Sequence, residues 1–254
     1  MKIGLVLSGG GARGIAHLGV IKALEEFGLS FSAISGTSSG SIVGALYAYG
    51  YSPQQILDII SKVSVFKSVR PAWTWMGLLS MDGLREVLFR HMPENNFSSL
   101  KLPMTIAATD IRKGTIEYFN DGELIPCIMA SCCVPAIFPP VSINGHTYVD
   151  GGVLDNLPAK PIRQNCDFII GSHCNPIGKD FDVRNLKVII ERSLLMAINS
   201  NTIISKELCD VLIEPTGLDK VSGFEIGKAQ DIFELGYEFT KANFDMRDFE
   251  RAVA

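Results

Sequence analysis

The sequence of 254 residues lacks several features that would assign a protein to a class at once. Its six cysteines form no C-x-x-C pair and have no metal-ligand spacing, so we expect reduced thiols without a metal site or disulfide framework. No basic tract offsets the formal charge of −4, which argues against a nucleic-acid partner. The apolar run at the N-terminus is too short for a signal peptide, because glycines interrupt it. These absences favour a cytoplasmic protein.

Charge is also missing from two long stretches, residues 28–57 and 124–145. Neither is a membrane-spanning helix, because the first is rich in serine and glycine and the second contains four prolines. A long run without charge is typical of a buried segment or of the wall of a dry cavity. We expect both stretches to line an apolar site, although ordinary core packing would explain the same composition.

Short apolar runs alternate with helical patterns along the chain. The runs predict strands over residues 2–8, 31–35, 104–109, 115–119, 146–149, 167–172 and 211–214. The patterns predict helices over residues 15–27, 39–49, 53–63, 82–91, 124–131, 186–205 and 227–243. This order favours one domain of the α/β class, spanning residues 1–254, with a mostly parallel sheet covered by helices on both sides.

Gly36-Thr37-Ser38-Ser39-Gly40 is a G-x-S-x-G sequence between a short predicted strand and a predicted helix. A strand that turns sharply into a helix forces the central serine into strained backbone angles and exposes its hydroxyl. Glycines flank it because larger side chains would clash there. An ordinary glycine- and serine-rich turn would have the same composition, but the strand–turn–helix context favours Ser38 as a nucleophile.

A second glycine-rich sequence, from Gly9 to Gly14, directly follows the first predicted strand. It matches G-x-G-x-x-G, which binds a dinucleotide in a Rossmann fold when an acidic residue follows the second strand. No Asp or Glu lies between residues 27 and 57, so that interpretation fails. The alternative is an oxyanion hole, in which consecutive glycine amides point at a developing alkoxide. Arg13 in this loop either adds positive potential or pairs with a surface carboxylate.

A nucleophilic serine needs a base, and Asp150-Gly151-Gly152 provides a candidate at the end of the predicted strand 146–149. Asp-Gly is also a common turn dipeptide, so Asp150 is the expected base only together with Ser38 and the glycine loop. A triad of Ser38, Asp150 and His173 would follow the chain order of an α/β-hydrolase. Those hydrolases place the nucleophile after several strands, however, and we expect all four histidines to be packing or surface residues.

The three sequences Gly9–Gly14, Gly36–Gly40 and Asp150–Gly152 resemble the motifs of the patatin-like phospholipases, in the same order. The sequence beginning Ala130-Ser131-Cys132-Cys133 resembles the family's A-S-x-x-x-P-x-x-F-x-P block. The resemblance covers residues 3–165 and is strongest to short, single-domain bacterial members. It implies a three-layer α/β/α sandwich, with the C-terminal helices of residues 186–254 packed on the same domain.

Carried over residue by residue, the resemblance implies a Ser–Asp dyad that hydrolyses fatty acyl esters of lipids. The nucleophile corresponds to Ser38 and the base to Asp150. The oxyanion loop corresponds to Gly9, Gly10, Gly11 and Gly14, and the glycines that support the motifs are Gly36, Gly40, Gly151 and Gly152. No metal or organic cofactor is implied. Cys132 and Cys133 stand where the family more often has small residues, which could make the site sensitive to oxidation.

Two questions stay open at this point. The chain could be a non-catalytic module that binds acyl lipids or a partner, although neither the dyad nor the loop is degraded. The weakly periodic segment 67–80 carries Trp73, Trp75 and Met76, and it is either a loop packed on the core or a lid. Tryptophan favours the boundary between water and lipid, so a lid of this kind predicts transient contact with a micelle or with the inner membrane surface.

Overall fold

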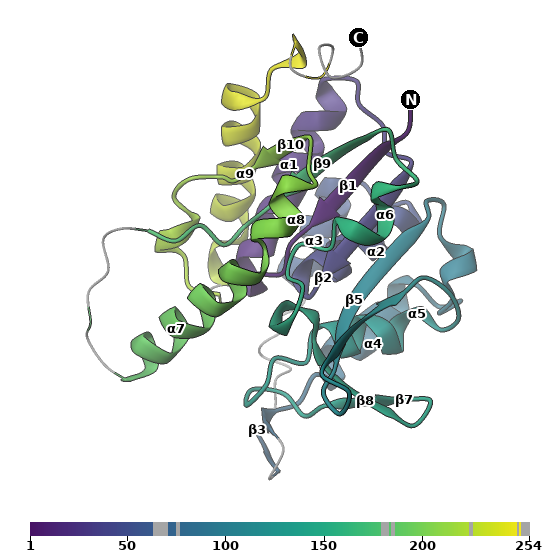
Figure 1. Ribbon diagram of the computed structural model, residues 1–254, viewed down its shortest axis with the longest axis vertical. Helices are drawn as coiled ribbons and strands as arrows, with labels where there is room; N and C mark the ends of the chain where they lie inside the picture. Colours follow the sequence, from purple (N-terminus) through teal and green to yellow (C-terminus); the bar gives the residue numbers. More distant parts are fainter. Residues whose placement is uncertain are drawn as a thin grey trace.

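The computed structural model of the protein describes residues 1–62, 71–74, 77–178, 183, 186–223, 226–247 and 249 (Figure 1). Within these residues an eight-stranded mixed sheet has the order β10-β9-β1-β2-β5-β8-β7, with β6 also paired to β5. The parallel strands are β10 (Val211–Ile213), β9 (Phe168–Ser172), β1 (Ile3–Leu7), β2 (Ala33–Thr37) and β5 (Met104–Asp110). The antiparallel ones are β6 (Thr115–Phe119), β7 (Val141–Ile143) and β8 (His146–Asp150).

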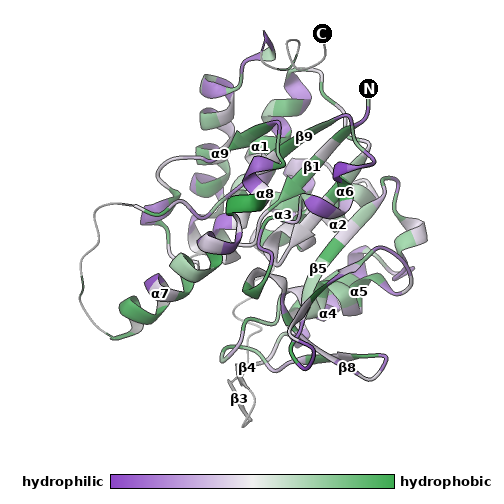
Figure 2. Ribbon diagram, viewed as in Figure 1, coloured by the Kyte–Doolittle hydropathy of each residue, from purple (hydrophilic) through white to green (hydrophobic). Residues whose placement is uncertain are grey.

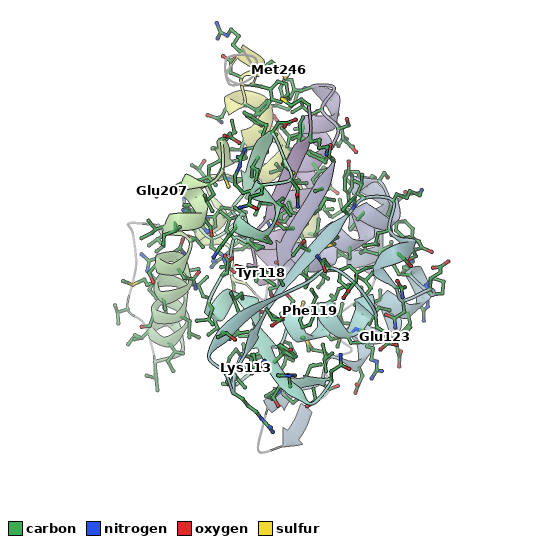
Figure 3. The ribbon with its side chains drawn as sticks, turned by 45° about the vertical axis from the view of Figure 1, so that its right-hand side comes forward. Lys113, Tyr118, Phe119, Glu123, Glu207 and Met246 are labelled. Atoms are coloured by element: carbon green, nitrogen blue, oxygen red, sulfur yellow. The ribbon has the colours of Figure 1, made fainter. Side chains whose placement is uncertain are left out.

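Helices cover both faces of the sheet, and alternating residues of the central strand β1 show it. Leu5 and Leu7 belong to the large apolar cluster under α1 (Ala16–Glu26), α2 (Ser39–Tyr49), α3 (Pro53–Lys62) and α9 (Ala229–Asn243). Val6 points to a smaller cluster formed with α6 (Lys160–Arg163) and with residues just after α8 (Ile203–Glu207). Side chains fill the space between these layers (Figure 3). The α/β sandwich with flanking helices is therefore confirmed.

The pairing of β5 brings the ends of two distant strands together. Ala107 pairs with Thr37 of β2 and Ala108 with Asp150 of β8, while both residues also pair with β6. A strand has only two edges, so β2 and β8 must share the edge opposite β6. They run toward each other along that edge and end at neighbouring residues of β5. The residues that follow β2 and those that end β8 therefore meet.

Three segments differ from the prediction. The segment 67–80 contains β3 (Pro71–Thr74) and β4 (Gly77–Leu79), which pair antiparallel, where a loop was expected. The predicted helix 186–205 is divided into α7 (Leu186–Asn201) and α8, because Thr202 Oγ1 donates back to the carbonyl of Asn199. The last helix begins with a 3₁₀ turn, Ile226–Lys228, before α9.

The remaining helices are α4 (Asp82–His91) and α5 (Leu124–Ser131), both within the predicted bounds. The N-terminus of α3 is a capping box, because Gln55 N donates to Ser52 Oγ and Ser52 N to Gln55 Oε1. Among the described residues, no helix has the length and apolarity that crossing a bilayer requires.

Candidate active site

Ser38 lies at the turn between β2 and α2, where the sequence places it. Its backbone has φ 53° and ψ −124°, a strained conformation for a residue with a side chain. The turn is tight because Gly40 packs on the end of β1, where a Cβ would come within 2.7 Å of the Ser8 carbonyl. The Ser38 amide donates to Ser131 Oγ at 2.8 Å, and Ser131 Oγ donates to the Ala107 carbonyl at 2.7 Å. Ser131 thus fixes the strained turn.

Asp150 ends β8 and is only 6% exposed. Its Oδ1 accepts a hydrogen bond from the Gly152 amide at 2.7 Å, while Oδ2 is buried and makes no hydrogen bond of normal geometry with the residues that the structure describes. Burial raises the pKa of this carboxyl to about 6, and the nearby Ser38 hydroxyl and the Gly152 amide each offset part of the rise. The site therefore holds a carboxylate that is more basic than an exposed aspartate, with one oxygen free to accept a proton.

Both residues line one cavity of about 440 Å³. Most of its lining is apolar and comes from α2, α3, α4, α7 and the segment between α5 and β7. The two charge-free stretches both contribute, the first through Ile42, Val43 and Leu46 and the second through Val134, Ile137 and Phe138. The volume is within the range of ligand pockets, and the lining suits a hydrocarbon chain.

The glycine loop lies against Ser38, and its peptide groups differ in how they are used. The Gly9 amide donates to the Asn156 carbonyl at 3.1 Å, so it is already paired. A Cβ on Gly9 would lie 3.0 Å from Ser38 Cβ, which explains why no larger residue fits there. In the described part of the chain the amides of Gly10 and Gly11 donate to no protein group, and both residues line the cavity.

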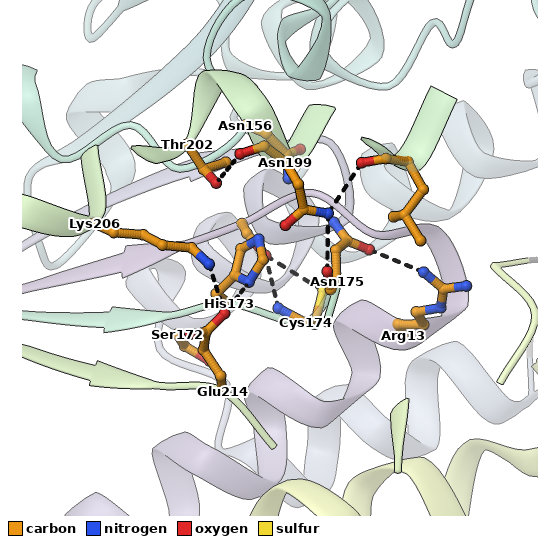
Figure 4. Close-up of polar contacts among 12 residues, drawn as sticks. Arg13, Asn156, Ser172, His173, Cys174, Asn175, Asn199, Thr202, Lys206 and Glu214 are labelled. Carbon is orange, nitrogen blue, oxygen red and sulfur yellow. Dashed lines mark hydrogen bonds and ion pairs between the residues drawn. The ribbon is translucent and has the colours of Figure 1, made fainter. Parts of the chain in front are cut away.

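Three groups hold the carbonyl of Gly9. It accepts hydrogen bonds from Asn175 Nδ2 at 2.5 Å, Cys174 Sγ at 3.3 Å and Asn156 Nδ2 at 3.4 Å. In a trans peptide the following N–H points the opposite way, so these bonds direct the Gly10 amide away from Asn175. Arg13 Nη1 donates to Asn175 Oδ1 at 3.3 Å and thereby orients that side chain (Figure 4).

Arg13 also donates through Nε to the Val221 carbonyl at 2.7 Å, and it lines the cavity together with Gly10, Gly11 and Gly14. Gly14 packs against the side chain of Ser39, beside the nucleophile turn. Gly36 packs against the backbone of Gly40, and Gly151 against Ala107 at the junction of the strands. The predicted site residues of all three motifs thus gather at one end of the sheet.

None of the four histidines lines the cavity. His173 Nδ1 contacts Glu214 Oε1 at 2.8 Å, and Lys206 Nζ contacts the same oxygen at 2.7 Å (Figure 4). His17 is fully buried between Ser172 Oγ and the Ser8 carbonyl, and burial lowers its pKa to about 4. His146 pairs with Asp110 at 2.9 Å. These contacts favour packing roles and argue against the triad.

Cys132 lines the cavity, and both Cys132 and Cys133 are buried. Burial raises the pKa of the Cys132 thiol well above its ordinary value and that of Cys133 to about 12. Oxidation proceeds through the thiolate, so these shifts argue against the expected oxidation sensitivity. Among the described residues, no group of three or more His, Cys, Asp or Glu could hold a metal ion.

Sequence reasoning missed Ser131, Asn156 and Asn175 as parts of the site. Ser131 and Asn156 lie within or just after recognisable motifs, which could have marked them. Asn175 follows β9 and carries no such signal. Of the tryptophan segment, Trp75 and Met76 lie outside the described residues, and Trp73 belongs to β3.

Comparison with known proteins places this arrangement. The chain is 34% identical over 174 residues to lysophospholipase NTE1 of Cryptococcus neoformans, covering 65% of this chain and 10% of that protein. It is 32% identical over 177 residues to an uncharacterized NTE family protein of Mycobacterium bovis, covering 68% of this chain and 49% of the other. The chain thus spans about half the length of the mycobacterial relative and far less of the fungal one.

Two solved structures share the fold at low sequence identity. VipD of Legionella pneumophila has a TM-score of 0.54 and 16% identity, covering 99% of this chain and 67% of that one. The type III effector protein ExoU has a TM-score of 0.50 and 14% identity, covering 100% and 54%. The patatin-like phospholipase family itself matches residues 5–162, a range that contains all three motifs. The chain belongs to the patatin-like phospholipase family.

Proposed function

We propose that the protein is a serine hydrolase that cleaves fatty acyl esters of lipids with the dyad of Ser38 and Asp150. Asp150 accepts the proton of the Ser38 hydroxyl while the hydroxyl oxygen attacks the ester carbonyl. Asp150 gives this proton to the leaving alkoxide oxygen as its bond to the acyl carbon breaks, so the alcohol departs, an acyl enzyme forms and Asp150 is again a base. A water molecule activated by Asp150 then attacks the acyl carbonyl and releases the fatty acid and free Ser38.

The oxyanion of each tetrahedral intermediate needs donors that are already in place. The amides of Gly10 and Gly11 are the candidates, because they are unpaired in the described part of the chain and line the cavity with Ser38. Gly9 was expected to contribute as well, but its amide is already paired with Asn156. In our proposal Gly9 acts through its carbonyl, whose three hydrogen bonds orient the Gly10 amide.

The observation that best supports the proposal is that two features of the site destabilise the folded protein. Ser38 has strained backbone angles, and Asp150 keeps a buried oxygen without a hydrogen bond of normal geometry among the described residues. Each feature destabilises the folded state, and strain of this kind is typical of catalytic sites. A binding module that only holds an acyl chain needs neither feature, so the site favours an enzyme over that alternative.

The substrate follows from the cavity and from the relatives. The apolar lining suits an acyl chain, and the fungal relative is named a lysophospholipase. We therefore propose an acyl ester of a phospholipid, bound without a metal or organic cofactor. We further propose a cytoplasmic protein that touches a lipid surface transiently, with Trp73, Trp75 and Met76 as contact residues.

Labelling with an alkyl fluorophosphonate tests the nucleophile. We expect one labelled serine, mapped by peptide analysis to Ser38, and turnover of p-nitrophenyl esters that Ser38→Ala abolishes. Graded ester lengths then report how long a chain the cavity accepts. Label on Ser39, Ser41 or Ser131, or turnover that persists in Ser38→Ala, would overturn the assignment. A folded protein without label and without turnover would favour the binding module.

A further inference from the structure

Two neighbouring helices beside the cavity expose large aliphatic side chains. Those of α7 and α8 that are 41–73% exposed are Leu186, Ile189, Ile190, Leu194, Met196, Ile203 and Ile204, and we call them the α7–α8 apolar surface. Single exposed apolar residues are ordinary, but a group of this size on adjacent helices marks a surface that is covered in function. Figure 2 shows hydrophobic colouring on much of α7, at the lower left of the molecule, and on α8.

Helix α7 is apolar on both of its sides. At 3.6 residues per turn, Leu186, Ile189 and Ile190 share one side, and that side carries no charged residue along the helix. The opposite side contains Leu195 and Ile198, which line the cavity. An apolar side of a helix is ordinarily buried. In the described part of the chain the inner side of α7 lines the cavity, whereas Leu186, Ile189 and Ile190 on the other side are exposed.

The two sides meet at the entrance to the cavity. Leu194 is 50% exposed and also lines the cavity, so the outer surface continues into the inner one without a polar break. Ala197, one turn further on, lines the cavity as well. A hydrocarbon chain that leaves the α7–α8 apolar surface therefore reaches the cavity of Ser38 along apolar side chains.

Hydrogen bonds fix the C-terminal end of α7 to the catalytic loop. Asn201 Nδ2 donates to the carbonyls of Gly152 and Val153 at 2.9 and 3.2 Å, directly after Asp150. Asn199 Nδ2 donates to the Asn175 carbonyl at 3.0 Å. The rest of the helix extends away from the sheet in Figure 1. The surface is thus held in a fixed position relative to the dyad while it projects from the body of the protein.

We propose that the α7–α8 apolar surface docks on a lipid surface and delivers an acyl chain past Leu194 into the cavity. Continuity with the cavity favours lipid over a second copy of this chain, which would cover the entrance. The inference rests on the proposed function for the fate of the chain, but docking itself requires no catalysis.

Sedimentation with vesicles of equal parts phosphatidylcholine and phosphatidylglycerol tests docking, with Ser38→Ala as the background so that no lipid is consumed. The test variant is Ile190→Ser with Ile204→Ser, two exposed positions outside the cavity lining. The matched control is Phe89→Ser with Ile111→Ser, which removes two exposed apolar side chains elsewhere. We expect the test variant to bind vesicles at least about tenfold more weakly, and the control to bind like the parent.

The same two double variants, made in the protein that retains Ser38, separate the effect on docking from the effect on catalysis. We expect the test variant to lose activity on vesicle-borne substrate and to keep its turnover of dissolved p-nitrophenyl butyrate. If the parent does not bind vesicles, or both variants bind equally, the proposal is wrong. It is also wrong if the parent is a dimer by light scattering and the test variant a monomer, which would make the surface a subunit interface. Vesicle binding without any esterase activity would reject the proposed function alone.

Discussion

Replacing Asp150 with Asn removes a buried carboxylate whose ionised form destabilises the folded protein. Burial raises the pKa of this carboxyl from 3.8 to about 6, and each pKa unit corresponds to about 1.36 kcal/mol. Ionising Asp150 in the folded protein therefore costs about 3 kcal/mol more than in the unfolded chain. Below pH 4 both states hold the proton and there is no cost. The cost develops as pH rises from 4 to 6 and is complete above pH 6.

Asparagine has nearly the same shape but carries no charge. Its side-chain oxygen can keep the hydrogen bond from the Gly152 amide, and its amide group lies near the Ser38 hydroxyl. At pH 7.5 we expect Asp150→Asn to raise the free energy of unfolding by up to about 3 kcal/mol. At pH 4 the gain should vanish. Because the variant has no base, esterase turnover should fall nearly as far as in Ser38→Ala.

Asp155 is the matched control, since it is also buried and its pKa is also raised by burial. Its carboxylate accepts hydrogen bonds from Tyr118 Oη at 2.7 Å, the Leu157 amide at 3.2 Å and Ser205 Oγ at 3.3 Å. An amide cannot accept all of these, so Asp155→Asn should lower stability by about 1–3 kcal/mol.

Urea unfolding at pH 7.5 and at pH 4, followed by circular dichroism, measures both variants. The reasoning about Asp150 is refuted if Asp150→Asn loses stability at pH 7.5, as Asp155→Asn is expected to do. It is refuted equally if Asp150→Asn gains the same stability at both pH values, because the gain would then have nothing to do with charge.

Three further predictions concern the reaction. Since Asp150 must be ionised to act as base, kcat/KM for a neutral ester should fall as pH drops through about 6; a limb near 4 would mean that burial does not tune the base. His173→Gln should retain most turnover in the folded protein, and inactivity equal to that of the nucleophile variant would restore the triad. Asn175→Ala removes a hydrogen bond to the Gly9 carbonyl, so kcat should fall about tenfold or more with little change in KM. A change confined to KM would show that Asn175 does not orient the Gly10 amide.

Local patterns predicted the parts of the site that lie within one segment. The helices 39–49 and 124–131 and the strand 115–119 have the predicted bounds. Gly50 ends the first helix, and the strand alternates in character after Gly114. The strained turn at Ser38 follows from its neighbours in sequence. Pairings between distant segments left no such trace. Nothing in residues 104–110 indicates that one edge of this strand accepts both β2 and β8.

Side chains that act through the backbone were equally hard to foresee. Asn175 is an ordinary loop residue until the fold brings it to the Gly9 carbonyl. The division between α7 and α8 depends on Asn199, Asn201 and Thr202, which bond to nearby carbonyls and not to solvent. The prediction of one long helix did not take these side-chain hydrogen bonds into account. Strands β3 and β4 are the reverse case: they pair where a loop was predicted, since two short antiparallel strands need little periodicity to form.

Because β2 and β8 meet on one edge of β5, the position of Asp150 beside Ser38 depends on the register in which β8 pairs with β5. Side chains alternate between the two faces of a sheet, so a slip of β8 by one residue along β5 would turn Asp150 to the opposite face. Such a molecule could keep its helices, most of its core and its circular dichroism spectrum. It would have no base beside Ser38. Specific activity per folded molecule therefore reports the fraction of molecules in which β8 pairs with β5 in the correct register. Circular dichroism does not report this fraction.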